Sequence, residues 1–108
     1  MRYRYFAAFY RTNPMFREDL NLKMTDLLSD KFRLVRCLSV ATFTDMYSAI
    51  LDKVLFNCQG EVWSLNAKHL IKTLGLQHTS MNVGDVILDT ETNRAYQVMV
   101  AGFMEVEK

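Results

Sequence analysis

Residues 2–11 alternate in a way that strongly limits how this chain can fold. One face of an extended segment would carry Tyr3, Tyr5, Ala7 and Phe9, and the other would carry Arg2, Arg4, Phe6, Ala8 and Tyr10. A period of two with many aromatic side chains predicts a β-strand. Because both faces are largely apolar after Arg4, we expect neighbours on both sides, as in a central strand. Pro14 ends the pattern, since proline cannot donate to a sheet ladder.

Three further segments have strand character, at residues 32–40, 85–89 and 94–106. The last two flank a polar turn and predict a C-terminal β-hairpin. Gly102 falls inside the long final strand, where it predicts a bulge or a bend. A chain of 108 residues has the size of one domain, so we expect a single domain over residues 1–108.

The clearest helix is predicted over residues 43–57. Thr42 and Asp45 have the spacing of a capping box, in which a hydroxyl and a carboxylate satisfy the first backbone amides. An apolar stripe at helical period then runs from Met46 to Cys58. Gly60 is expected to end this helix by adopting the left-handed conformation.

Two other helices are predicted on weaker patterns. Residues 65–74 place Leu70, Ile71 and Leu74 on an inward face, and Gly75 follows as the stop. Residues 15–29 also have apolar spacing of the helical type, although polar residues interrupt it.

These patterns together predict an α+β fold, with a small mixed or antiparallel sheet of about four strands packed against one main helix. The helix at 65–74 is expected to cover one edge of the sheet. The predicted core consists of Tyr5, Phe9, Leu34, Leu38, Ile50, Val54, Leu70, Leu74, Val86, Val98 and Val100.

Charge and cysteine content narrow the partner classes and the compartment. Lys and Arg total 13 against 12 Asp and Glu, so no bulk charge attracts nucleic acid or anionic lipid.

Cys37 and Cys58 lack a CxxC spacing, and we expect two buried reduced thiols, with one disulfide as the alternative. No apolar run reaches the roughly 18 residues of a membrane helix. Arg11 interrupts the first apolar stretch before it resembles a signal peptide, so we expect a cytoplasmic protein.

No pattern for catalysis, a metal or a cofactor emerges. His69 and His78 are the only histidines, and neither has a metal-ligand spacing to a cysteine or to the other. Glycine-rich nucleotide motifs are also missing, and no local motif would activate a cysteine nucleophile. We therefore expect a protein that is not an enzyme and that has no cofactor and no metal site.

The segment 77–85 has two interpretations. In the structural one, Val83 enters the core, Gly84 adopts a backbone conformation that other residues avoid, and Asp85 binds loop amides. In the functional one, His78, Thr79 and Ser80 line a binding face whose amides and hydroxyls accept a phosphate or carboxylate.

Trp63 has two interpretations as well. A tryptophan near a helix start usually closes the edge of a core and finds a partner for its indole N–H. The alternative is an exposed aromatic anchor for a partner protein. Arginines and tyrosines also alternate over residues 2–5, but alternation separates them onto opposite faces, which disfavours an RNA-binding platform.

The C-terminal half of the chain resembles a family of small uncharacterised proteins from tailed bacteriophages. The residues that carry the resemblance are Glu61-Val-Trp-Ser-Leu-Asn-Ala-Lys68, Leu74-Gly-Leu76 and His78-Thr-Ser-Met-Asn-Val-Gly-Asp-Val-Ile87. The family has a W-S-x-N step, a short helix, and then H-T-S-M-S-V-G-D followed by Val or Ile. Asn82 stands where serine is usual, and Leu65 where proline is usual. The resemblance implies a phage or mobile-element origin and an accessory role.

We therefore expect a non-enzymatic phage accessory protein that binds a host macromolecule, as a host-takeover or anti-defence inhibitor in the cytoplasm of an infected bacterium. A host protein is the favoured partner. A module that binds nucleic acid or a nucleotide signal is one alternative, and a virion or assembly component is the other. The expected binding residues are Trp63, Asn66, His78, Thr79 and Ser80, placed near one another by a helix about 15 Å long.

Overall fold

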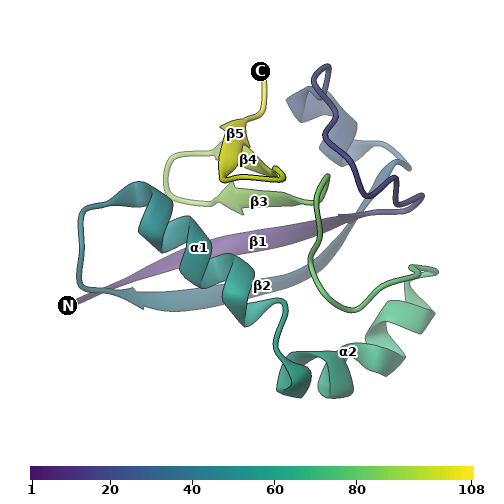
Figure 1. Cartoon of the computed structure of the whole chain (residues 1–108), viewed down its shortest axis with the longest axis horizontal. Helices are drawn as coiled ribbons and strands as arrows, with labels where there is room; N and C mark the ends of the chain where they lie inside the picture. The colour runs from purple at the N-terminus through teal and green to yellow at the C-terminus, as the bar shows by residue number, and fades with distance from the viewer.

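A single antiparallel sheet organises the chain, as the computed structural model of residues 1–108 shows (Figure 1). The strands follow the order β2-β1-β3-β4-β5 across the sheet. Two helices, α1 and α2, follow β2, and α1 crosses one face of the sheet. The elements are β1 (Arg2–Arg11), a short 3₁₀ helix (Met24–Leu28), β2 (Phe32–Thr42), α1 (Tyr47–Asn57), α2 (Glu61–Thr73), β3 (Val86–Asp89), β4 (Arg94–Val98) and β5 (Phe103–Glu105). The predicted α+β class and the antiparallel alternative for the sheet are confirmed.

The prediction that β1 is a central strand is also confirmed. It pairs with β2 along its whole length and with β3 through residues 6–9. Phe6, Ala8 and Tyr10 lie on the face toward the helices and are completely buried. The opposite face is only partly covered, and for that reason Tyr5, predicted to be in the core, is 61% exposed.

The main helix begins later than the sequence predicted, and its expected cap is wrong. Thr42 is the last residue of β2, where it pairs with Arg2, so it is not free to cap a helix. The helix α1 starts at Tyr47 after Met46, and no side chain caps it. Ile50, Leu51 and Val54 form its buried face.

The start of α2 was also predicted too late. Gly60 has a φ of −62° and immediately precedes the helix, so it does not adopt the left-handed conformation expected of a stop residue. Glu61 occupies the first turn, where its negative charge favours the helix N-terminus. At the other end, Gly75 has a φ of +72°, which confirms the predicted stop.

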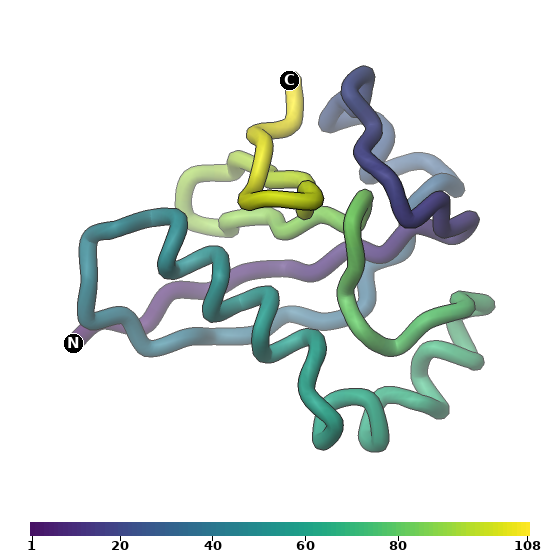
Figure 2. The backbone as a smooth tube through the Cα atoms, in the orientation of Figure 1, coloured from purple at the N-terminus to yellow at the C-terminus, as the bar shows by residue number.

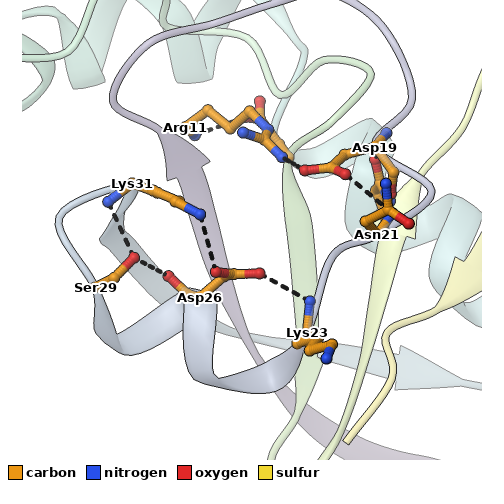
Figure 3. Close-up of polar contacts among 9 residues, drawn as sticks. Arg11, Asp19, Asn21, Lys23, Asp26, Ser29 and Lys31 are labelled. Atoms are coloured by element: carbon orange, nitrogen blue, oxygen red, sulfur yellow. Dashed lines mark hydrogen bonds and ion pairs between the residues drawn. The ribbon is translucent and has the colours of Figure 1, made fainter.

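Residues 12–31 fold over part of the second sheet face rather than forming the predicted helix at 15–29. Polar contacts hold this segment in place, and Figure 3 shows the ion pair between Arg11 and Asp19 and the Asp26 carboxylate that accepts from the Lys23 amide and Lys31. The hydrogen bond from the backbone amide of Lys23 lowers the pKa of Asp26. Figure 2 shows the segment beside the C-terminus, where Lys23 pairs with Glu107. A second core forms beneath it from Leu22, Leu27, Phe32, Val86, Ala95 and Val106.

The C-terminal hairpin is confirmed, but the long strand predicted at 94–106 is two strands. β3 pairs with β4, and Asn93 completes the turn with a φ of +58°. The chain then reverses between Met99 and Gly102, whose φ is +78°, and continues as β5. Gly102 therefore marks a tight turn, which is a sharper change of direction than the predicted bulge.

The predicted core is correct for the residues that one of the two cores encloses. Leu38, Ile50, Val54, Val86 and Val98 are buried. Phe9 and Leu74 are partly buried. Tyr5 and Leu34 lie on the open part of the sheet, Leu70 on the outer side of α2, and Val100 in the turn after β4, so these four are exposed.

Candidate binding site

Hydrogen bonds to the Thr79 carbonyl join α2 to the sheet through Trp63. The hydroxyl of Tyr10 and the indole Nε1 of Trp63 each donate a hydrogen bond of 2.8 Å to the Thr79 carbonyl. Tyr10 is fully buried, and this burial raises its pKa far above the ordinary value, so its hydroxyl remains a donor. This arrangement confirms that Trp63 closes the edge of the core and finds a partner for its indole.

Asp85 anchors the loop that supplies the Thr79 carbonyl. Its carboxylate is buried and accepts from the backbone amides of Arg11 (2.9 Å) and Asn82 (2.8 Å). The Nε2 of His78 donates a third bond of 2.9 Å to the same carboxylate. The His78 ring also stacks on Tyr10, with centroids 4.9 Å apart. Asp85 therefore binds loop amides, as the structural interpretation predicted, and His78 adds a contact that this interpretation did not include.

Gly84 is required by both conformation and space. Its φ is +95°, and a Cβ there would lie 3.1 Å from the Arg17 carbonyl oxygen. Val83 departs from the prediction because it is only half-buried and belongs to neither core. Met81 fills the core position instead.

The same loop is fastened to the end of α1. The Met81 amide donates to the Cys58 carbonyl at 2.9 Å, and the Gln59 side chain donates to the Met81 carbonyl at 3.0 Å. Ser80 lies 3.3 Å from Ser64 between their hydroxyl oxygens. The corner where α1 meets α2 is therefore a rigid platform.

A groove of about 470 Å³ opens on the outer side of this corner. Phe56 and Val62 line it and are 72% and 73% exposed. The guanidinium of Arg36 lies 4.3 Å from the Trp63 ring centroid and donates to the Asn57 carbonyl. The groove is lined by Arg36, Phe56, Asn57, Gly60, Glu61, Val62, Trp63 and Asn66.

The predicted site residues divide into two groups. Trp63 and Asn66 line the groove directly. The other three do not line the groove: Thr79 accepts from the Trp63 indole, Ser80 lies against Ser64, and His78 stacks on Tyr10. Sequence reasoning missed Arg36, Phe56 and Val62. Phe56 gave a usable signal, because it lies outside the apolar stripe of α1 and so had no core position to fill.

The two cysteines lie in different environments. Burial raises the pKa of the Cys58 thiol to about 11, so it is protonated and unreactive at neutral pH. Cys37 is exposed on β2, which corrects the expectation that both thiols are buried; neither is in a disulfide. No group of three or more His, Cys, Asp or Glu side chains is arranged to hold a metal ion.

No family model, curated protein or solved structure matches this chain. The resemblance to phage proteins therefore stays a prediction from the motif alone. None of the helices has the length and apolar character needed to cross a membrane.

Proposed function

We propose that this protein is a non-enzymatic binding module that captures an apolar side chain of a partner protein in the groove at the α1–α2 corner. The observation that carries the proposal is the pair of exposed apolar residues, Phe56 and Val62, beside the stacked Arg36 and Trp63. Tryptophan and arginine are the residues most enriched at the energetic centres of protein interfaces. A rigid corner also loses little entropy when a partner binds.

In this proposal the loop around His78 acts as support for the groove. Thr79 and Asp85 keep the indole of Trp63 in position, and the ring of Trp63 then forms one wall of the binding surface. Substitutions in the loop would reduce binding indirectly, through the orientation of Trp63. Substitutions of Phe56 or Val62 would reduce binding directly.

The motif resemblance directs the search for a partner toward bacterial host proteins, consistent with an accessory role in host takeover or inhibition of defence in the cytoplasm of an infected cell. Nucleic acid is less well supported. Arg2 and Arg4 form ion pairs with Glu91 and Asp89, respectively, which partly neutralises the arginines next to Tyr3 and Tyr5.

Site-specific photo-crosslinking tests the proposal. A photoreactive phenylalanine analogue at Asn66, within the groove, is compared with the same analogue at Thr92, an exposed residue of the β3–β4 turn. Both proteins are irradiated in bacterial extract, with and without nuclease. We expect one host protein to crosslink at position 66 alone, and this product to disappear when Phe56→Ser is added.

Three other outcomes would contradict the proposal. A crosslink that depends on intact nucleic acid would favour the nucleic-acid alternative. Crosslinks that form only to phage structural proteins in infected cells would favour the virion alternative. Equal products from positions 66 and 92 would mean that the groove has no specific role.

A further inference from the structure

The sheet has one long edge that no other strand pairs with. β2 is the outermost strand, is 11 residues long and pairs only with β1. The opposite edge is β5, which has only three residues. Long edges with unpaired amides and carbonyls are sites where another strand can add to a sheet.

The pairing register identifies which residues of β2 present those groups. Tyr5 uses its carbonyl toward β3, where it accepts from the Thr90 amide, so Tyr5 does not exchange bonds with Ser39 opposite it. Bonded and non-bonded pairs alternate along an antiparallel ladder. Cys37, Ser39 and Ala41 therefore direct their amides and carbonyls away from β1, and Leu38 and Val40 direct theirs toward it.

One side chain forms a hydrogen bond with the backbone of this edge. The Nζ of Lys53, on α1, donates to the Ala41 carbonyl at 2.6 Å, which agrees with the outward direction of that group. No bond from another element reaches the backbone of Cys37 or Ser39. Lysine is a common protector of sheet edges and is easily displaced because its side chain is long and flexible. The edge is therefore available to a strand that offers Ala41 a better donor.

The charged side chains of β2 itself are all basic. Arg33, Arg36 and Lys53 lie on or beside β2, and none of them forms an ion pair. The strand itself, from Phe32 to Thr42, contains no acidic residue. Opposite charges across an interface favour association, and like charges oppose it. A partner strand with carboxylates would be attracted, whereas a second copy of β2 would bring two cationic edges together.

We propose that the edge of β2 binds an extended, acidic segment of a partner protein by strand addition. This inference rests on the proposed function, because it names the form and charge of the partner segment that would lie beside the groove. Arg36 links the two surfaces, since it belongs to β2 and also lines the groove. Alternate side chains of the added strand would face the groove side and the open sheet face that carries Tyr5 and Leu34.

Amide hydrogen exchange with two model peptides tests the inference. In one nine-residue peptide valine alternates with glutamate, and in the other valine alternates with lysine. At saturation we expect the glutamate peptide to slow exchange at Cys37 and Ser39 by about tenfold or more, with little change at Leu38 and Val40, which already bond to β1. The lysine peptide should have no effect.

Three variants make the result specific. Ser39→Pro removes an outward amide without breaking a bond to β1, so it should abolish peptide binding while the melting temperature stays close to wild type. Lys53→Ala frees the Ala41 carbonyl but also removes one cation, so the glutamate peptide should still bind, and its affinity should depend less on salt concentration. Arg33→Glu should weaken binding of the glutamate peptide and allow the lysine peptide to bind. If Ser39→Pro fails to fold, the other two variants still decide the outcome.

The inference is overturned if both peptides bind equally, if neither alters exchange, or if sedimentation shows a dimer that protects Cys37 and Ser39. Its failure is separable from failure of the proposed function. Phe56→Ser should abolish the crosslink from position 66 and leave the glutamate peptide bound. Ser39→Pro should abolish peptide binding and leave the crosslink from position 66.

Discussion

The stability of the α1–α2 corner and of the loop packed against it should depend strongly on Asp85. One oxygen of its carboxylate accepts from the Arg11 amide, and the other accepts from His78 and the Asn82 amide. In Asp85→Asn the amide oxygen can keep the first bond, but the NH₂ group then faces the Asn82 amide, which is itself a donor, and the charge that all three partners bind is lost. Hydrogen bonds to a charged group contribute about 1.5–3 kcal/mol each and are not additive, so we expect a loss of about 3 kcal/mol.

Urea unfolding and thermal melting would measure this loss. For a domain of this size, 3 kcal/mol corresponds to a fall in Tm of about 12–24 °C. Emission from Trp63, the single tryptophan, should also shift to longer wavelength in the folded variant, because the loop no longer fixes the Thr79 carbonyl. Asp52→Asn is the matched control, since Asp52 is exposed on α1. A cost below about 1 kcal/mol for Asp85→Asn, with unchanged emission, would refute the assignment of Asp85 as the anchor.

Further predictions concern the backbone and the thiols. Gly84→Ala should lower the free energy of unfolding by about 1–3 kcal/mol in urea titrations, because of its positive φ and the close Arg17 carbonyl; Gly60→Ala, with open space and a negative φ, should cost less. Cys37 should react with a thiol reagent in the native protein, and Cys58 only at the rate of unfolding; equal rates would contradict their assigned burial. Because the pKa of Cys58 is raised from 9.0 to about 11, its contribution to stability is complete below about pH 9 and is lost between about pH 9 and 11. Cys58→Ala should flatten the pH dependence of stability in that window, and an unchanged slope would contradict the assigned pKa.

The elements that depend on local pattern were predictable from the sequence. The aromatic alternation of β1 and the Asn93 turn are local, and both are present in the structure. Errors occurred where two local signals compete for one residue. Thr42 suits a helix cap, but pairing with Arg2 keeps it in β2, and backbone bonds across a sheet outweigh a single cap. The exposure of Tyr5 depends on how far residues 12–31 extend over the sheet, which no local pattern specifies.

The candidate site was only partly predictable for a similar reason. The motif at 77–85 correctly indicated a fixed loop, because glycine and aspartate in that order have a clear conformational role. The groove, however, depends on the contact between Arg36 on β2 and Trp63 on α2, which are far apart in the chain. Such a pairing follows from the tertiary structure alone.

In the proposed function, the groove at the α1–α2 corner is the surface that binds a partner. The most direct test is the affinity of the crosslinked partner for the double variant Phe56→Ser with Val62→Ser. As a control, Leu20→Ser with Leu28→Ser removes two exposed apolar residues outside the groove. We expect the groove variant to raise Kd by about 30-fold or more, as loss of an interface centre does, with Tm unchanged. Equal affinity for the groove variant and wild type, or a loss confined to the control variant, would contradict the account.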